Sequence, residues 1–426
     1  MMSGPNADRR ARNGSLVWLA LLAISILINY VDRGNLAVAA PLLKGELQIS
    51  NIQIGVLITA FFWTYTVLIA ISGWIVDRFD VNWVLGAGFA LWSVATAITG
   101  LVHGFAMLVL LRMLLGAGES VAFPSCSKII ALNIESRYRG LANALLITGM
   151  GLGPALGTYA CGMSMARWGW RPVFIVIGAA SLLWLVPWLM FKPQNRNRKG
   201  HTDLRIPALQ ILKQRSFWGV SIGHFCAGYP LYFIIVWLPL YLVNARHQTM
   251  RQMSRESAFF YVVFAVVAPL SGFAADRLVR RGHNVTLVRK GCVAIGECLM
   301  IPGVLACGAA DATVSFAGLM VLGAGCGFVA PCVYVFAQLL AGPAGAGKWT
   351  AFQSFFGNLS GVAVGPITGW IVDRTASYSS AFALCAAISA VGALCWLLLV
   401  GKVEQITWPS AEAPVSLRPK LSESAT

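Results

Sequence analysis

The chain has 426 residues, of which 58% are hydrophobic and only 11% are charged, and its mean hydropathy is +0.71. A soluble globular protein carries about 25% charged residues, so this composition excludes an ordinary soluble domain and indicates a protein that crosses a membrane many times. The formal net charge of +16 could suggest nucleic acid as a partner, but Lys and Arg cluster in short loops between apolar stretches, which is the pattern of membrane topology.

Twelve apolar stretches are long enough to cross a bilayer, at about 20 residues per span. We therefore predict an all-α membrane protein with twelve transmembrane helices, embedded in a lipid bilayer. The predicted spans cover residues 16–38, 52–75, 82–101, 105–130, 141–165, 170–191, 216–243, 256–277, 287–308, 312–340, 349–372 and 379–400.

An even number of spans places both chain ends on one side of the membrane. Most of the 32 Lys and Arg residues fall on that side, and the positive-inside rule then predicts that both termini are cytoplasmic. The basic segment 192–215 divides the chain nearly in half. The predicted parts are a cytoplasmic N-terminal segment (1–15), a first six-helix half (16–191), the basic cytoplasmic loop (192–215), a second six-helix half (216–400) and a cytoplasmic tail (401–426).

Signals for chemistry in the loops are weak. The ten cysteines fall in apolar stretches without Cys-x-x-Cys spacing, so we expect packing residues and not metal ligands or disulfides. Gly342-x-x-x-x-Gly347-Lys348 resembles a phosphate-binding loop, but Trp349 follows where Ser or Thr is required, and the segment joins two membrane helices. We expect no enzyme activity, no cofactor and no metal.

Four charged residues lie inside the predicted spans of the first half. Asp32 and Arg33 fall in the first span, and Arg112 and Glu119 in the fourth. Such residues are expensive in a membrane and usually face a cavity and each other. Arg112 and Glu119 are seven residues apart, so they share one helix face. Two acids and two arginines could together bind an organic anion and a proton, although Asp32-Arg33 could instead be a helix-end pair near the outer surface.

The two halves repeat a set of Gly and Pro motifs in equivalent spans. Six plus six spans in parallel halves, joined by a basic loop, are typical of major facilitator transporters. The paired motifs are Gly73-x-x-x-Asp77-Arg78 with Gly272-x-x-x-Asp276-Arg277, Leu115-Gly116-Ala117-Gly118 with Leu322-Gly323-Ala324-Gly325, Pro124 with Pro331, and Gly149-x-x-x-Gly153-Pro154 with Gly361-x-x-x-Gly365-Pro366.

The intramembrane charges are not repeated. Glu119 aligns with Cys326, and Arg112 aligns with Leu319. The helix scaffold is thus shared by both halves while the charges belong to the first half alone. This asymmetry favours a functional role for Arg112 and Glu119 over a purely structural ion pair.

From about Leu16 to Val400, the sequence resembles the anion:cation symporter family of the major facilitator superfamily. The motifs that carry the resemblance are Asn29-Tyr30-Val31-Asp32-Arg33, Arg112 with Gly116-x-Gly118-Glu119 and Pro124, Arg137-x-Arg139-Gly140, His224-Phe225-Cys226, Trp237-Leu238-Pro239-x-Tyr241 and Gly357-Asn358-Leu359-x-Gly361. Bacterial members carry hexonates, hexuronates, aldarates, tartrate and aromatic carboxylates. The resemblance implies transport of such an acid across a bacterial inner membrane.

Two positions depart from the family pattern. The loop after the second span, Asp77-Arg78-Phe79-Asp80-Val81-Asn82, lacks the usual basic residues after Asp-Arg. A glutamine that meets substrate hydroxyls in sugar-acid carriers corresponds here to Met150. This favours a less hydroxylated or aromatic acid over a polyhydroxylated one.

The charged residues suggest a coupling mechanism. A guanidinium fork fits a carboxylate, so Arg33 and Arg112 are the predicted substrate clamps. Burial raises a carboxyl pKa and a nearby arginine lowers it, and these opposing effects can place an acid near working pH. We therefore predict that Asp32 and Glu119 bind the coupled protons.

Further polar or amphipathic side chains in spans one, two, seven, ten and eleven could line the cavity, although each could equally be satisfied within the bundle. A lone acid, Glu297, has no role that the pattern assigns. Asp77, Arg78, Asp276 and Arg277 lie at cytoplasmic helix ends and are predicted to form state-dependent salt bridges that gate the transporter. The cavity-lining candidates are Asn29, Tyr30, Tyr65, His224, Tyr229, Tyr232, Gln338 and Asn358.

The sequence thus predicts a monomeric, proton-coupled symporter that imports a small organic carboxylate by alternating access and has no nucleic-acid partner. A facilitated uniporter or an anion exchanger of the same fold is the first alternative, and a non-transporting membrane sensor is the second. The site hypothesis predicts that Arg112→Ala abolishes substrate binding without unfolding the protein.

Overall fold

The structure is a computed structural model that describes residues 5–134, 139–193 and 207–408. In the first half, the described residues form helices α1 (Pro5–Leu47), α2 (Asn51–Arg78), α3 (Val81–Thr99), α4 (Phe105–Glu119), α5 (Ala122–Asn133), α6 (Arg139–Trp168), α7 (Trp170–Leu182) and α8 (Leu185–Phe191). The second half has α9 (Ala208–Leu212), α10 (Arg215–Leu240), the π-helix η2 (Tyr241–Ala245), α11 (Met250–Arg280), α12 (Val285–Cys307), α13 (Ala312–Thr375), α14 (Ser379–Leu394) and the π-helix η3 (Cys395–Leu399).

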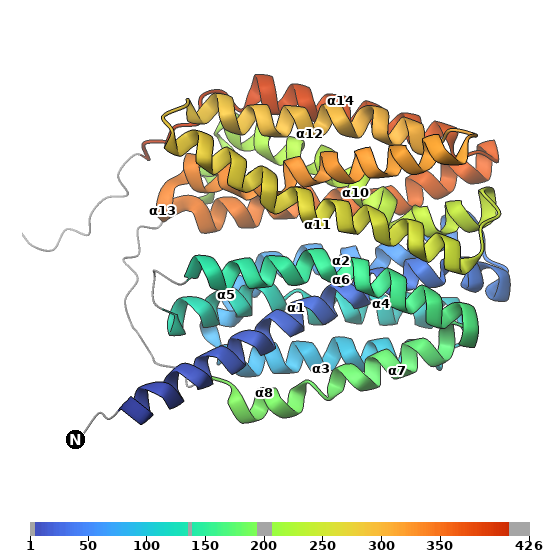
Figure 1. The fold of residues 1–426 in the computed structure, drawn as a ribbon, viewed down its shortest axis with the longest axis horizontal. Coiled ribbons are helices and arrows are strands. Elements are labelled where there is room, and N and C mark those ends of the chain that lie inside the picture. The colour runs from blue at the N-terminus through green and yellow to red at the C-terminus, as the bar shows by residue number, and fades with distance from the viewer. Residues whose placement is uncertain (1–4, 135–138, 194–206, 409–426) are drawn as a thin grey trace, which may run out of the picture.

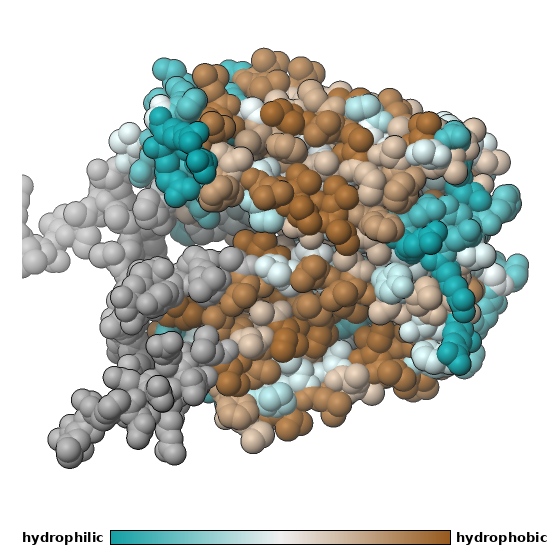
Figure 2. All heavy atoms as spheres, viewed as in Figure 1, coloured by the Kyte–Doolittle hydropathy of each residue, from teal (hydrophilic) through white to brown (hydrophobic). Residues whose placement is uncertain are grey.

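The two halves form two bundles that lie side by side, the blue-to-green one below and the yellow-to-red one above (Figure 1). Apolar residues cover the middle of the face seen in Figure 2, and hydrophilic residues gather at its right-hand end. Large apolar side chains on the outside are freely accessible, for example Val176 at 64% and Leu183 at 68%. Such a belt is stable against lipid tails, so this is the exterior of a membrane protein.

Among the described residues, eleven helical segments are long and apolar enough to cross a membrane. They match the predicted spans except for the fifth, which corresponds to the 30-residue, glycine-rich helix α6. Helix α13 contains two spans, because the chain turns at Gly342 with a positive φ of 65°. The expected all-α architecture of two six-span halves in the major facilitator fold is therefore confirmed.

Equivalent helices of the two halves begin with the same capping motif. Ser50 and Gln53 form a capping box at the start of α2, and Thr249 and Gln252 form one at the start of α11. In each case the hydroxyl accepts the N–H of the third helical residue, while the amide side chain returns to the backbone N–H of the cap. The internal repeat therefore extends to the ends of the helices.

The repeated glycines allow helices to cross with their backbones in contact. A Cβ added at Gly118 of α4 would lie 2.8 Å from the carbonyl oxygen of Gly88 in α3. The equivalent crossing in the second half places a Cβ at Gly325 of α13 at 2.7 Å from the carbonyl oxygen of Gly296 in α12. Small residues at such crossings let helices pack closely in a membrane, which explains why this motif occurs in both halves.

The halves also meet through glycines. A Cβ at Gly55 of α2 would collide with the carbonyl oxygen of Gly365 in α13, and a Cβ at Gly162 of α6 would collide with Ser254 of α11. These contacts lie toward the end of the molecule that holds the α1–α2 turn (residues 48–50), opposite the start of α1 (Figure 1). We refer to the end with the α1–α2 turn as the far end.

One acidic side chain ties the halves together at the far end. The Asp373 carboxylate, near the end of α13, accepts hydrogen bonds from the backbone N–H of Asn51 (3.3 Å), the Asn51 side-chain amide (2.7 Å) and the backbone N–H of Ile52 (3.0 Å). The first N–H groups of a helix have no partner within the helix and attract negative charge. Asp373 of the second half therefore satisfies the start of α2 in the first half.

Candidate substrate-binding site

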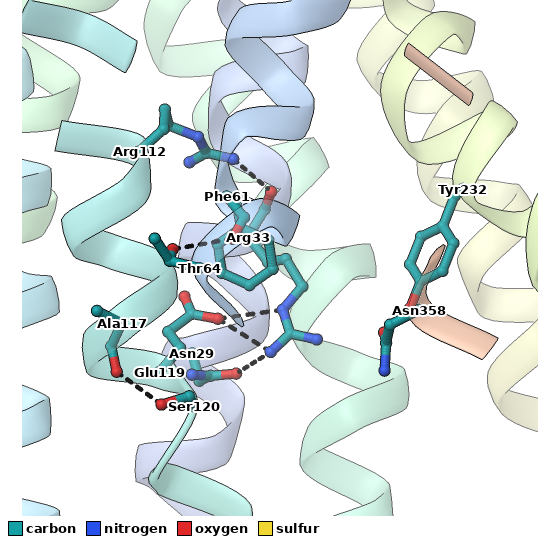
Figure 3. Close-up of polar contacts among 10 residues, drawn as sticks. All are labelled: Asn29, Arg33, Phe61, Thr64, Arg112, Ala117, Glu119, Ser120, Tyr232 and Asn358. Atoms are coloured by element: carbon teal, nitrogen blue, oxygen red, sulfur yellow. Dashed lines mark hydrogen bonds and ion pairs between the residues drawn. The ribbon is translucent and has the colours of Figure 1, made fainter. Parts of the chain in front are cut away.

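The fourth span is interrupted at the residue that carries its acid. Helix α4 ends at Glu119, Ser120 and Val121 form a turn, and α5 begins at Ala122. The Ser120 hydroxyl donates to the carbonyl oxygen of Ala117 at 2.8 Å. Pro124 falls in the first turn of α5, where its missing N–H costs little. The interruption leaves Glu119 at a helix end inside the membrane, facing α1 (Figure 3).

Glu119 forms an ion pair with Arg33 of α1. Both Nε and Nη2 of Arg33 donate to Oε2 of Glu119, at 3.1 and 3.0 Å, and Nη2 also donates to Oδ1 of Asn29 at 3.1 Å (Figure 3). Glu119 is 1% exposed and Arg33 is 9% exposed. Charge-assisted hydrogen bonds of this kind are about twice as strong as neutral ones, so the pair fixes α1 against the broken helix.

Three aromatic rings surround the Arg33 guanidinium. Its Cζ lies 4.5 Å from the ring centroid of Tyr30, 5.0 Å from that of Phe61 and 4.7 Å from that of Tyr65. An arginine near an aromatic face gains about 0.5–2 kcal/mol of electrostatic attraction, depending on desolvation. The rings therefore stabilise the position of the guanidinium whether or not Glu119 is its partner.

The other two charges are buried as well. Arg112 is 2% exposed, and its Nη2 donates to the backbone carbonyl oxygen of Arg33 at 3.3 Å, while its Nε and Nη1 have no protein partner. Asp32 is fully buried, and its Oδ1 accepts a hydrogen bond from Asn35 at 3.2 Å while Oδ2 has no partner. Arg112 and Glu119 each interact electrostatically with the other three charged groups of the cluster. Two cations and two acids make a group that is neutral when all are ionised.

Arg112 and Glu119 were expected to share one helix face. Both lie within α4, which ends at Glu119, and they interact electrostatically. The hydrogen bonds go to α1: Glu119 bonds to the side chain of Arg33, and Arg112 bonds to the backbone carbonyl of Arg33. Of the two arginines, Arg33 is the one whose side chain reaches the tyrosines.

Side chains of the second half lie opposite Arg33. The Tyr232 hydroxyl of α10 donates to Oδ1 of Asn358 in α13 at 2.8 Å (Figure 3). The Tyr232 ring lies 4.6 Å from that of Phe62, an α2 residue of the first half. Tyr232 also interacts electrostatically with Arg33 and Tyr65. The structure therefore places Tyr30, Tyr65 and Tyr232 around one guanidinium.

Tyr334 belongs to the same group, although the sequence did not single it out. It is 41% exposed, it interacts electrostatically with Arg33 and Tyr65, and its ring centroid lies 5.6 Å from that of His224. The His224 ring fills the space left by the missing side chain of Gly357. A tyrosine within an apolar run gives no periodic signal of its own, so only the packing of α10 against α13 shows its position.

Not every residue that the sequence singled out lies in this group around Arg33. Tyr229 is 1% exposed and packs within the core of the second half beside Phe225, and Gln338 is exposed farther along α13. Met150 is half-buried and packs on the same apolar cluster as Tyr30 and Tyr232. Glu297 is fully buried, away from Arg33, with Trp396 and Ser389 as its polar neighbours.

The predicted gating residues show one helix-to-helix bond. Nη2 of Arg289 in α12 donates to the Asp276 carboxylate of α11 at 2.5 Å. Arg78 and Arg277 are exposed at helix ends, and the side chain of Asp77 lies outside the described residues. Arg289 was not among the predicted residues, because a loop-side arginine at the start of a span gives no signal of its partner.

These features define a class of protein: a membrane transporter built from two six-span halves, with a buried charged cluster in the first half that Tyr232 of the second half approaches. The chain belongs to the major facilitator superfamily, whose model matches residues 22–288 and 257–424. It is accordingly a transporter and not an enzyme, and its relatives support the resemblance to the anion:cation symporters.

Three similar proteins illustrate the relationship. The chain is 29% identical to a probable sulfoacetate transporter of Cupriavidus necator, over 89% of this chain and 93% of that protein. It is 26% identical to a hexuronate transporter of Bacillus subtilis (93% and 98%) and 28% identical to a probable L-galactonate transporter of Escherichia coli (90% and 88%). Among solved structures, a bacterial homologue of the lysosomal transporter Spinster superposes with a TM-score of 0.75 at 17% identity, covering 89% of this chain and 96% of the other, and so shares the fold.

Proposed function

We propose that the protein is a proton-coupled symporter that imports a small organic carboxylate by alternating access. It would lie in a bacterial inner membrane, with both termini in the cytoplasm and the far end facing outward. The excess of Lys and Arg in the loops at the end where α1 begins supports this orientation. The named relatives are a probable sulfoacetate transporter, a hexuronate transporter and a probable L-galactonate transporter, and the acids in these names are all small organic anions.

The observation that carries the proposal is the buried pair of Arg33 and Glu119, at 3.0 Å. An arginine that is paired with an acid cannot offer its full charge to a substrate carboxylate. If a proton neutralises Glu119, the guanidinium becomes an unpaired cation in a site of low dielectric, where an unpaired charge is costly. A carboxylate from the substrate removes that cost, so proton binding favours anion binding.

Charge balance gives the order of events. The four-charge cluster of Asp32, Arg33, Arg112 and Glu119 is neutral when fully ionised, so an added anion is compensated only by an added proton. Protonation of Glu119 or Asp32 would come first, and the substrate carboxylate would then replace Glu119 at Arg33. Release of the proton toward the cytoplasm would restore the Arg33–Glu119 pair and expel the substrate.

The aromatic surroundings suggest which acids fit. Tyr30, Phe61 and Tyr65 border the guanidinium on the first-half side, and Tyr232 and Tyr334 approach from the second half. Phenol hydroxyls can bond a few polar groups of a substrate, and the rings favour a flat or apolar body. With Met150 in the cluster and Asn358 as the amide nearest to Tyr232, an acid with few hydroxyls fits better than a hexonate.

Alternating access depends on where the two halves are in contact. The contacts Gly55–Gly365 and Asn51–Asp373 lie toward the far end. The conformation is therefore one in which the far end is closed, and transport requires these contacts to separate so that Arg33 can be reached from that side.

The test is uptake by proteoliposomes that contain the purified protein. A thermal-shift screen of hexonates, hexuronates, aldarates, C4 dicarboxylates, aromatic carboxylates and sulfoacetate first finds a ligand, because a ligand stabilises the folded state by mass action. An inward proton gradient should then drive accumulation of that acid above its external concentration. Accumulation that does not depend on the pH gradient would refute proton coupling. Exchange of internal for external acid without net accumulation would identify an anion exchanger. Binding without any saturable flux would indicate a sensor.

A further inference from the structure

A second polar cavity lies at the far end, separate from the Arg33 site. It has a volume of about 350 Å³ and is open to the surface. Residues of both halves line it: Lys44 of α1 and Asn51 of α2 from the first half, and Tyr241, Arg246, Val372 and Tyr378 from the second. Most of its lining surface is polar, which distinguishes it from the lipid-facing grooves of the exterior.

Two cations line the cavity, and neither has a carboxylate as its hydrogen-bond partner. Lys44 Nζ donates to the side-chain oxygen of Asn51 at 2.7 Å, and Arg246 Nη1 donates to the backbone carbonyl oxygen of Ala309 at 2.7 Å. Both partners are neutral. Among the described residues, neither cation forms a salt bridge with a carboxylate.

One carboxylate lies beside the cavity. Asp373 bonds the Asn51 amide and the N–H groups at the start of α2, and it interacts electrostatically with Tyr378 in the cavity wall. Glu46 is paired elsewhere, since it accepts two hydrogen bonds from Arg171 and one from Trp170. The two cations that line the cavity therefore outnumber the Asp373 carboxylate beside it.

We propose that this cavity is an anion site that binds a small carboxylate or oxyanion between Lys44 of the first half and Arg246 of the second. An ammonium and a guanidinium are the groups that bind such anions best in proteins. Asn51, Tyr241 and Tyr378 complete the wall, although the Asn51 amide already donates to Asp373 and the Tyr241 hydroxyl to the carbonyl oxygen of Cys307. The anion is either the transported acid, bound a second time, or an inorganic oxyanion from the outer solution.

The position of the cavity gives the site a regulatory consequence. Its two cations come from different halves and line one cavity only while the far end is closed. A ligand that binds one of two conformations better shifts the population toward that conformation. An anion in this cavity therefore stabilises the closed far end and slows its reopening, so external anions inhibit uptake from outside.

The test measures anion binding to the purified protein. Every variant also carries Arg33→Ala, which disables the central site. The result therefore does not depend on whether the proposed transport function is correct. Malonate and sulfate are the probes, titrated calorimetrically at constant ionic strength. We expect saturable binding that Lys44→Gln and Arg246→Gln each weaken by about tenfold or more, as expected for the loss of one charge-assisted contact. Arg246→Lys should retain most of the binding, and so should Arg255→Gln, which removes an exposed cation of α11 outside the cavity.

The outcomes separate clearly. Absence of saturable binding, or equal binding by Lys44→Gln, Arg246→Gln and Arg255→Gln, would overturn the site. Binding of malonate alone would identify the carboxylate as the ligand, and binding of both probes would identify a general oxyanion site. Adding Gly55→Ala, which forces α2 from α13 at the far end, should weaken binding, whereas Gly291→Ala, with no atom within 4 Å of the added carbon, should not. Unchanged affinity in Gly55→Ala would show that the site does not depend on far-end closure.

Discussion

The guanidinium of Arg33 and the carboxylate of Glu119 bond across two helices, with two nitrogens on a single oxygen, Oε2, at 3.1 and 3.0 Å. Oε1 of Glu119 has no protein partner. The acid thus holds Arg33 through one oxygen while its second oxygen remains free of protein hydrogen bonds. This geometry connects the charge of Glu119 directly to the availability of Arg33.

The first prediction concerns Glu119→Gln. Glutamine keeps an oxygen for Arg33 but cannot carry a negative charge or take up and release a proton. We expect the variant to bind the acid with a weaker dependence on pH, because Asp32 still titrates, and to exchange internal for external substrate, while proton-driven accumulation is lost. Uptake and counterflow in proteoliposomes, compared at equal protein content, measure both. A variant that still accumulates substrate against its gradient would remove Glu119 from the coupling mechanism.

The second prediction concerns Arg33→Lys and Arg33→Ala. Lysine keeps the charge but not the planar fork that bonds a carboxylate with two nitrogens. We expect substrate affinity to fall by about tenfold or more in Arg33→Lys, in line with the loss of one charge-assisted hydrogen bond, and binding to be undetectable in Arg33→Ala. Calorimetric titration with the acid found by the screen measures the affinity, and melting without ligand confirms that each variant is folded. Wild-type affinity in Arg33→Ala would place the substrate elsewhere.

The spans and the repeat could be predicted from the sequence because they depend on local composition. Length and hydropathy locate each span, and the Gly118 and Gly325 motifs mark equivalent helix crossings before any fold is known. The charged residues were also identifiable, since an Arg or Glu inside an apolar run is unusual. These signals require no knowledge of which helices touch.

Partners across helices could not be predicted in this way. The seven-residue spacing of Arg112 and Glu119 predicted a shared helix face, but it gave no sign that Glu119 would bond to Arg33, which lies 86 residues away in another helix. Tyr229 and Tyr232 are alike in sequence context, yet the structure buries Tyr229 in the core and directs Tyr232 toward Asn358. The packing of α10 against α13 determines which tyrosine is buried in the core, and no local sequence pattern predicts this packing.

The third prediction concerns Asp373→Ala. Asp373 accepts three N–H groups of Asn51 and Ile52, and loss of a comparable helix cap costs about 0.5–2 kcal/mol. Because this bond joins the halves, its loss should destabilise the closed far end. We expect faster hydrogen–deuterium exchange in peptides 51–58 and 365–373.

Asp311→Ala is the matched control for Asp373→Ala. Asp311 caps the start of α13 within its own half, so the effect of its loss should be confined to that helix start. Equal exchange at residues 51–58 in both variants would contradict a role for Asp373 between the halves.

The fourth prediction concerns Gly55→Ala. A methyl group at this position would collide with the carbonyl oxygen of Gly365 and would lie 3.1 Å from the ring of Trp237. The carbonyl belongs to a helix backbone and cannot rotate away, so the two helices must separate, at a cost of about 1–3 kcal/mol that is typical of overpacking. The cost falls on the conformation with the far end closed, whereas a conformation in which α2 and α13 have parted accommodates the methyl group freely. We therefore expect Gly55→Ala to shift the protein toward far-end opening, with faster hydrogen–deuterium exchange at residues 51–58 and a slower transport cycle.

Gly291→Ala is the control for Gly55→Ala. It adds the same methyl group to a helix where no atom lies within 4 Å and should change neither measurement. If Gly55→Ala transports at the wild-type rate with unchanged exchange, close contact between Gly55 and Gly365 is not required to close the far end.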